Sequence, residues 1–280
     1  MNDLEPGRLV RAARGVQRLL APNPSLMTGP GTNTYLLGDP VSAVIDPGPL
    51  DAAHLAALEG VAPQLALIFL THTHADHAAA ALRLAQRTGA RIVGRPGPSD
   101  GRQVTDFRPD LIPERDQSFE IAGMQLRAID TPGHASNHVC SLLESERLLF
   151  SGDHILDGVT PVIPAPDGDM GAYLSSLERL RDYHPLAIAP GHGRVLHEPE
   201  AVIAGIIAHR RRREAKVLQA LERSGQGRLD ELLGAVYDDV PAQLHPLARL
   251  TLTAHLIKLE QDGHCRREGD TWHRVTSKLS

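Results

Sequence analysis

The sequence predicts an α/β fold in which two β-sheets pack face to face and helices cover the outside. Strand pairs alternate with helical segments up to residue 224, which is the pattern of such a sandwich. Four short apolar runs end in a tight turn that is followed at once by a histidine or an aspartate. The composition changes after Gly225-Gln226-Gly227, so we expect a first domain over residues 1–224 and a second over residues 225–280.

Length and composition exclude several classes of protein. A chain of 280 residues with 41% hydrophobic and 22% charged residues can bury a sizeable core and is ordinary for a globular protein. The net charge of −5 argues against a general nucleic-acid-binding surface. Cys140 and Cys265 are far apart and are expected to be free and buried, as in a reducing compartment. No apolar run reaches the length of a membrane span, and we expect a cytoplasmic protein with no membrane partner.

The first half of the chain contains a series of short strands and two helices. Residues 34–38 and 43–46 read as paired strands, and residues 51–58 as a helix capped by Asp51. An apolar run over residues 65–70 predicts a buried strand. The alanine-rich segment that follows, residues 78–85, favours a helix.

The second half repeats this alternation. Residues 118–129 predict a hairpin, and residues 139–143 pair with 147–150 around a polar turn. Leucines at helical spacing predict a helix over residues 170–184, followed by a strand over 186–189. A long helix is expected over residues 199–223, because Pro199 is favoured in a first helical turn.

The C-terminal segment has the element order of a winged helix. Two helices over residues 229–237 and 244–261 precede a hairpin that turns at Gly269-Asp270. Such a segment binds nucleic acid in some proteins and serves for packing or dimerisation in others. The sequence therefore leaves open both a nucleic-acid partner and a homodimer.

The densest chemical signal is the run H-x-H-x-D-H directly after the predicted strand 65–70. Neutral imidazoles suit borderline divalent ions such as Zn²⁺, and an adjacent carboxylate adds charge and a second ligand type. A solvated polar loop is the plain alternative, but four ligand-type residues in six positions favour a metal site. The residues of this run are His72, His74, Asp76 and His77.

Three further candidate ligands each follow a short apolar run and a turn: His134, Asp153 and His192. Asp46 also lies at a strand end, before Pro47-Gly48. We expect it to accept a hydrogen bond from a ligand histidine and so fix that ring's tautomer. A turn-forming role is the alternative for Asp46.

This set of residues, in this order, resembles the metallo-β-lactamase superfamily, whose fold is an αββα sandwich. The stretches 31–36, 166–170 and 209–214 are similar to a narrower group, the lactamase-beta-2-like proteins. Members of that group carry a winged-helix-like C-terminal segment, and an animal member is a ribonuclease acting on single-stranded RNA.

The resemblance implies a metal-dependent hydrolase with two divalent ions, with Zn²⁺ expected and Mn²⁺ or Fe²⁺ as alternatives. His72, His74 and His134 would hold one ion, Asp76, His77 and His192 the other, and Asp153 would bridge them. A hydroxide bridging the ions would be the nucleophile, and Asp76 would act in catalysis by orienting it and shuttling a proton.

The substrate stays open among three hypotheses. The first is an endoribonuclease acting on single-stranded RNA, and the second is a small-molecule acyl hydrolase acting on an ester, amide, thioester, lactone or β-lactam. The third is a non-catalytic ligand-binding relative. A solvated helix face is the alternative for the arginine run 210–213. The expected substrate contacts are Asn33, Tyr173, Arg210 and Arg211. Tyr173 lies one turn into its helix and could line the cleft, and a packing tyrosine is the alternative.

Overall fold

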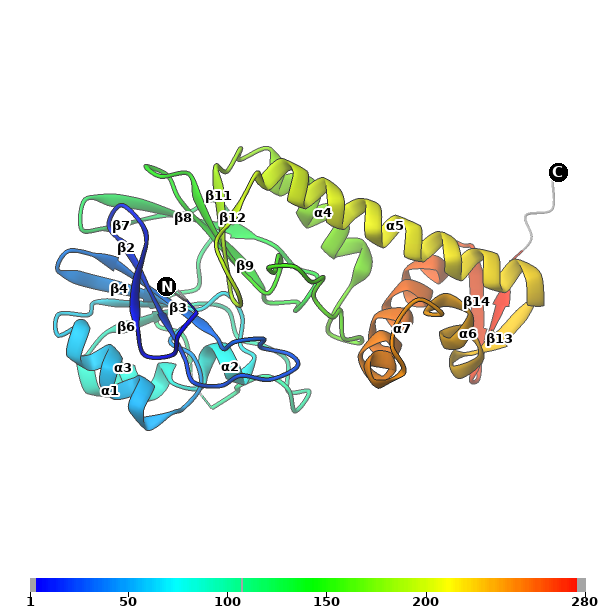
Figure 1. The fold of residues 1–280 in the computed structure, drawn as a ribbon, viewed down its shortest axis with the longest axis horizontal. Helices are drawn as coiled ribbons and strands as arrows, with labels where there is room; N and C mark the ends of the chain where they lie inside the picture. Colours follow the sequence, from blue (N-terminus) through cyan, green and yellow to red (C-terminus); the bar gives the residue numbers. More distant parts are fainter. Residues whose placement is uncertain (1–3, 107, 276–280) are drawn as a thin grey trace.

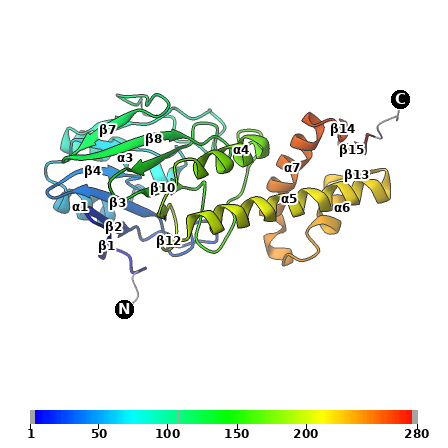
Figure 2. The same ribbon diagram turned by 90° about the horizontal axis from the view of Figure 1, so that it is seen from above.

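The computed structural model describes residues 4–106 and 108–275. Two six-stranded sheets lie face to face, helices cover both outer faces, and a small helical segment with its own sheet follows at the C-terminus (Figures 1 and 2). The α/β class, the αββα sandwich and the winged-helix-like end are therefore all confirmed.

The first sheet alternates its side chains between two cores. In β3, Leu36 packs under the outer helices, whereas Tyr35 and Leu37 face the second sheet. The strand order is β1-β2-β3-β4-β5-β6, and β4, β5 and β6 run parallel. The strands are β1 Leu9–Ala13, β2 Val16–Leu20, β3 Asn33–Gly38, β4 Val41–Ile45, β5 Leu67–Phe69 and β6 Arg91–Val93.

Helices α1 (Ala52–Val61) and α3 (Ala81–Thr88) cover the outer face of this sheet. Asp51 caps α1 as expected, because its side chain accepts a hydrogen bond from the His54 amide. The expected helix over 78–85 is two helices, the short α2 (Ala75–Ala78) and α3.

The second sheet has the order β12-β11-β10-β9-β8-β7, and α4 (Met170–Arg181) and α5 (Pro199–Ser224) cover its outer face. Between the sheets, the rings of Tyr35 and Phe150 pack with centroids 5.1 Å apart. The strands are β7 Ser118–Ile121, β8 Met124–Asp130, β9 Val139–Leu143, β10 Leu148–Gly152, β11 Ala187–Pro190 and β12 Leu196–His197.

The C-terminal segment is a winged helix with a three-stranded sheet of order β13-β15-β14. Sequence analysis did not identify β1, β12 and β13 as strands, and β12 is only two residues long. The edge strand β1 carries an arginine and is half exposed, and β13 contains a glycine, so neither has the alternating apolar pattern. The elements are β13 Gln226–Arg228, α6 Leu229–Val236, η1 Ala242–Leu244, α7 His245–Gln261, β14 Cys265–Glu268 and β15 Thr271–Arg274.

Helix α5 belongs to two cores. Its first turns contribute Ile203 and Ile207 to the core against the second sheet. Its last turns contribute Val217 and Leu221 to the core of the C-terminal segment. A domain boundary at residue 224 stays a proposal, because the packing of the second unit begins on α5.

Cys140 and Cys265 are both free and buried, as expected. Burial is the main reason that the pKa of the Cys140 thiol is raised to about 12 and that of Cys265 to about 11, so both behave as small apolar side chains. Among the helices of the described residues, none combines the length and the apolar content that a bilayer span requires.

Candidate metal centre

All seven candidate ligands converge at one edge of the sandwich, in two groups. Within each group, one potential ligand atom per residue lies within 4.8 Å of all the others. We call the first group the histidine subsite and the second the mixed subsite. The histidine subsite consists of His72, His74 and His134, and the mixed subsite of Asp76, His77, Asp153 and His192.

The convergence follows from where the strands end. The run after β5 supplies His72 and His74 and then enters α2 with Asp76 and His77. Strands β10 and β11 are parallel neighbours, so the residues that follow them, Asp153 and His192, emerge side by side. Gly191 permits this approach, because a Cβ there would lie 2.6 Å from Cε1 of His77 and 2.7 Å from Oδ1 of Asp153.

In the histidine subsite, hydrogen bonds at the outer ring nitrogens fix which nitrogen carries a lone pair. Nδ1 of His134 donates to the Val162 carbonyl at 2.7 Å, so its Nε2 carries the lone pair. The Thr71 hydroxyl donates its proton to Asp46 and therefore accepts from Nδ1 of His72 at 3.0 Å. Nε2 of His72 is consequently unprotonated as well.

Both of these lone pairs face Nδ1 of His74, at 2.9 Å from His72 and 3.0 Å from His134. Nδ1 of His74 can donate at most one proton, so at least one nitrogen–nitrogen contact is repulsive without a cation between the rings. The donor set of the histidine subsite therefore fits a divalent ion.

The mixed subsite is oriented in the same way. Nδ1 of His77 lies 2.8 Å from Oδ2 of Asp46, and Nδ1 of His192 lies 3.0 Å from the Gly31 carbonyl. Asp46 thus makes the contact that the sequence analysis expects of it, and it also binds the amide and hydroxyl of Thr71. The inner Nε2 atoms of His77 and His192 are buried without a good hydrogen bond.

Two carboxylates complete the centre. Oδ1 of Asp153 lies 3.2 Å from Nε2 of His77 and 3.3 Å from Nε2 of His192, and its Oδ2 lies 3.7 Å from Nε2 of His134. Oδ2 of Asp76 lies 3.3 Å from Nε2 of His192. Asp153 therefore spans both subsites, whereas Asp76 belongs to one and is the more exposed of the two.

The protonation equilibria of the two subsites differ. Burial lowers the pKa of His74 to about 4 with help from His134, and burial also lowers the pKa of His72 and His134. Burial acts in the same direction on His192, but the charges of Asp153 and Asp76 outweigh it and raise its pKa to about 9. The mixed subsite therefore attracts cations more strongly.

Neutral imidazoles and carboxylates are the ligands of Zn²⁺ and similar ions. The unpartnered inner nitrogens and the two carboxylates fit two such ions. The residues of each subsite would hold one ion, and Asp153 is placed to contact both.

The structure places Asn33 and Tyr173 away from any open surface. Asn33 is fully buried and donates to the carbonyls of Pro190 and Gly193, so it holds the loop that carries His192. Tyr173 is also fully buried in the core and donates to the His154 carbonyl. Neither side chain has surface with which to contact a substrate.

The four arginines of the run 210–213 on α5 point in different directions around the helix. Arg210 and Arg213 are buried and face the C-terminal segment, whereas Arg211 and Arg212 are exposed. Arg211 pairs with Glu178 on the outer surface at 3.2 Å. Of the expected substrate contacts, only Arg210 lies beside a cavity that reaches the metal centre.

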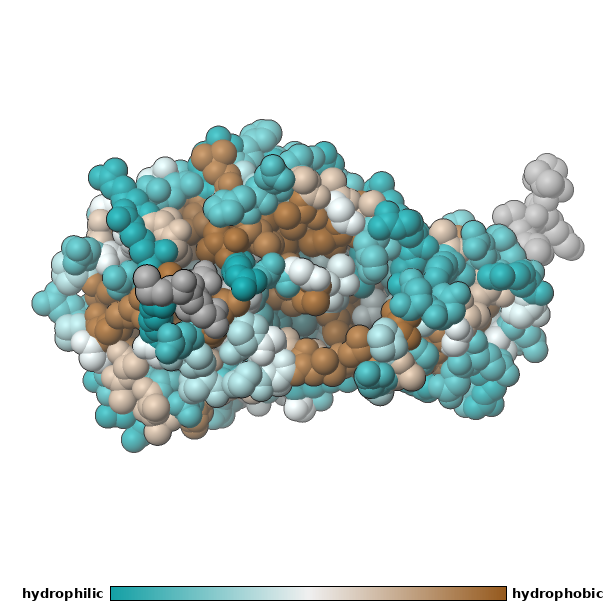
Figure 3. All heavy atoms as spheres, in the orientation of Figure 1, coloured by the Kyte–Doolittle hydropathy of each residue, from teal (hydrophilic) through white to brown (hydrophobic). Residues whose placement is uncertain are grey.

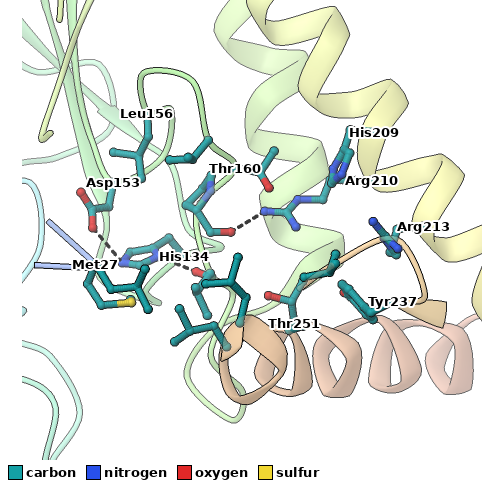
Figure 4. Close-up of a pocket in the computed structure, with 18 residues that line it drawn as sticks. Met27, His134, Asp153, Leu156, Thr160, His209, Arg210, Arg213, Tyr237 and Thr251 are labelled. Carbon is teal, nitrogen blue, oxygen red and sulfur yellow. Dashed lines mark hydrogen bonds and ion pairs between the residues drawn. The ribbon is translucent and has the colours of Figure 1, made fainter. Parts of the chain in front are cut away.

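That cavity has a volume of about 360 Å³ and lies between the two-sheet sandwich and the C-terminal segment. His134 and Asp153 line one end, and Figure 4 shows Arg210, Arg213 and Tyr237 on the opposite side. Figure 3 shows a hollow bordered by hydrophobic side chains in the middle of this face. The apolar lining consists of Leu26, Met27, Leu156, Val159, Pro161, Val162, Val240, Leu244, Leu247 and Ala248.

Sequence reasoning missed this apolar lining. Its residues come from a loop near the N-terminus, the loop after β10, and helix α7 with the segment before it, and no local pattern connects them. One signal in the sequence could have pointed to it. Leu26 and Met27 are consecutive apolar residues in a loop that has no strand or helix pattern to bury them, so an exposed apolar patch could be expected there.

Comparison with known proteins agrees with this architecture. Residues 27–192 match the family model of the metallo-beta-lactamase superfamily. Residues 229–272 match the model of the beta-lactamase associated winged helix domain. Both matches fall within the segments expected from the sequence.

Individual relatives extend over nearly the whole chain. A beta-lactamase-like protein 2 homolog from Drosophila melanogaster is 35% identical, over 92% of this chain and 92% of that protein. The atrochrysone carboxyl ACP thioesterase AgnL7 from Paecilomyces divaricatus is 31% identical, over 95% of this chain and 87% of that protein. A metallo-beta-lactamase family protein from Thermus thermophilus shares the fold, with a TM-score of 0.78 at 23% identity over 94% of this chain and 99% of that one. The chain therefore belongs to the metallo-beta-lactamase superfamily and is a metal-dependent hydrolase.

Proposed function

We propose that the protein hydrolyses small-molecule acyl compounds, thioesters or esters, whose acyl group occupies the cavity between the two parts of the chain. The observation that supports this most directly is the shared lining: His134 and Asp153 belong both to the metal centre and to a mainly apolar cavity. A concave, apolar site with a few polar groups is typical of small-molecule binding. A relative named as a thioesterase supports the same class.

The residues of the centre would divide the reaction between them. Two bound divalent ions would supply a water that is nucleophilic at neutral pH and a Lewis acid for the attacked carbonyl. Asp76 is the carboxylate that is partly open to solvent, so it can accept the proton of the attacking water and return it to the leaving thiolate or alkoxide. Asp46 would keep His77 in one tautomer throughout. The products are an acid and a thiol or alcohol.

Cleavage of single-stranded RNA is the second candidate, supported by the winged-helix segment. The arginine run supports it less than the sequence alone suggests. Two of its members are buried, and Arg211 is paired with a carboxylate. Only 3% of the residues are aromatic, which leaves few platforms on which bases could stack.

A matched pair of variants tests the cavity assignment. Leu26 is 69% exposed and lines the cavity, whereas Leu186 is 61% exposed and does not. We expect wild-type kcat/KM on N-acetylcysteamine thioesters to rise from acetyl to octanoyl, because the longer chain fills more of the cavity. Leu26→Asp should reduce kcat/KM for octanoyl about tenfold more than for acetyl, since a carboxylate at the mouth opposes apolar burial, and Leu186→Asp should change neither.

The same metal-loaded protein is assayed on labelled single-stranded RNA. RNA cleavage without thioester hydrolysis would contradict the proposal and favour the second candidate. Equal effects of Leu26→Asp and Leu186→Asp would show that the cavity does not bind the acyl group. The assignment as a hydrolase would not be affected.

A further inference from the structure

The end of the cavity opposite the metal centre contains a buried cation without a carboxylate partner. Arg210 is only 3% exposed and lines the cavity. Within residues 4–106 and 108–275 no carboxylate lies at ion-pair distance from its guanidinium. Its contacts are neutral: one Nη donates to the Pro161 carbonyl, and Cζ lies 5.5 Å from the centroid of the Tyr173 ring. A buried charge of this kind is unfavourable unless a counter-charge reaches it.

Other polar atoms at the same end also lack partners. Nε of Arg210, Oη of Tyr237 and Nδ1 of His209 are all buried without a hydrogen bond. All three residues line the cavity, and Figure 4 shows them on the side away from His134 and Asp153. Buried polar groups are nearly always satisfied in native proteins, so several orphans around one cavity indicate a ligand that binds them.

The net positive charge at this end of the cavity is close to one unit. Arg213 also lies at this end, but Asp239 neutralises it through a contact of 2.7 Å. Arg210 is thus the uncompensated cation of the cavity, and a carboxylate, with one negative charge and a planar pair of oxygens, matches one guanidinium. A phosphate monoester, with more than one negative charge, would bring excess charge into an apolar surrounding.

We propose that Arg210, together with Tyr237, is the specificity determinant for acyl substrates that carry a carboxylate at the far end of an apolar acyl group. The scissile carbonyl would lie at the metal centre, the apolar middle against the cavity walls, and the carboxylate at Arg210. This inference rests on the proposed acyl hydrolase function and narrows its substrate class.

The test compares substrates that differ only in that charge. Glutaryl, suberyl and sebacyl monothioesters of N-acetylcysteamine are assayed beside their neutral methyl esters. At the chain length that spans the cavity we expect kcat/KM for the acid to exceed that of the methyl ester about tenfold or more, mainly through KM. Equal values at every length would overturn the proposal.

Three variants separate recognition from folding. Arg210→Gln should abolish the preference for the acid, and Arg210→Lys should restore part of it because the charge returns. Arg212→Gln, an exposed neighbour in the same run, should keep the wild-type preference. Unfolding temperatures are measured for all three. A folded Arg210→Gln variant that still prefers the acid would contradict the assignment.

A binding measurement distinguishes failure of this inference from failure of the proposed function. Suberate and octanoate are titrated calorimetrically into the metal-loaded protein; each has one carboxylate for the metal centre, and only suberate has a second. Suppose that suberate binds more tightly than octanoate, that Arg210→Gln removes this difference, and that no thioester is hydrolysed. This result would contradict the hydrolase proposal and support the carboxylate site. Thioester hydrolysis without a preference for the charged substrate would contradict the carboxylate site and keep the hydrolase proposal. Absence of both hydrolysis and preferential suberate binding would overturn both proposals.

Discussion

The histidine subsite and the mixed subsite lie side by side and differ in charge. The first presents three imidazoles whose pKa values are lowered by burial, so the rings are neutral at physiological pH. The second contains two carboxylates, which raise the pKa of His192 to about 9. The imidazoles of the histidine subsite can bind a metal ion without losing a proton, but this subsite contains no carboxylate of its own to attract one. The mixed subsite contains two carboxylates, but its His192 must lose a proton before it can bind an ion. The predictions below test this difference.

The largest effect should come from Asp153, because it contacts histidines of both subsites. Asp153→Asn should remove the charge that two bound ions would share and eliminate turnover, a loss beyond the roughly 10²–10⁴-fold that one acid–base group supplies. Elemental analysis should show a lower metal content, while the exposed control Asp182→Asn keeps the wild-type content. Full metal content in Asp153→Asn would show that the subsites do not depend on this residue.

Asp76 should matter for chemistry more than for folding. It is partly exposed and belongs to the mixed subsite alone. Asp76→Ala should lower kcat by roughly 10²–10⁴-fold, as expected for a residue that moves a proton, with an unchanged unfolding temperature of the metal-free protein. A variant that keeps more than about a tenth of wild-type turnover would exclude this role.

Asp46 acts only through His77 and Thr71, so its effect should be smaller. Asp46→Asn keeps the size of the side chain but weakens the hold on the His77 ring. We expect metal affinity of the mixed subsite to fall about 10–100-fold, the usual cost of losing such a partner. The loss at the histidine subsite should be smaller, because Asp46 acts on His72 only through the Thr71 hydroxyl. Equal losses at both subsites would indicate a folding defect, which circular dichroism would detect.

The smallest effect is a difference in pH dependence, measured by chelator competition on variants that retain one subsite. In His74→Ala, metal binding at the mixed subsite displaces the proton that His192 holds below about pH 9. Its affinity should therefore rise up to about tenfold per pH unit between about pH 6 and 8 for each proton released. In His192→Ala, the histidine subsite should show a flatter dependence, because His74 is neutral above about pH 5. Parallel slopes would contradict the contrast between the subsites.

The residues of the metal centre can be found from the sequence because each follows a strand end. Six positions after β5 hold four of them, and the others follow β8, β10 and β11. Asp46 could be inferred for the same reason, since it directly follows β4. Their positions at strand ends mark them as candidates, and the resemblance to the superfamily groups them into one site without knowledge of the packing.

The cavity could not be predicted in this way. Four consecutive arginines cover a full helical turn, so the sequence cannot show which of them faces inward. The tertiary packing decides it: Arg210 is buried against the Pro161 carbonyl and the Tyr173 ring, whereas Arg211 is exposed. Tyr173 shows the converse: its position one turn into a helix suggested a cleft residue, but the second sheet buries it completely.

Helix α5 has a consequence for how a ligand enters. It is one unbroken helix of 26 residues, about 39 Å long, and its two ends are anchored in different cores. The C-terminal segment cannot swing away from the sandwich without bending that helix or exposing one of the cores. The cavity walls are therefore preorganised, and a ligand that fits loses little conformational entropy of the protein on binding. Selectivity would then arise because acyl groups of the wrong shape do not fit the rigid cavity. The cavity would not change its shape to accommodate many different acyl groups.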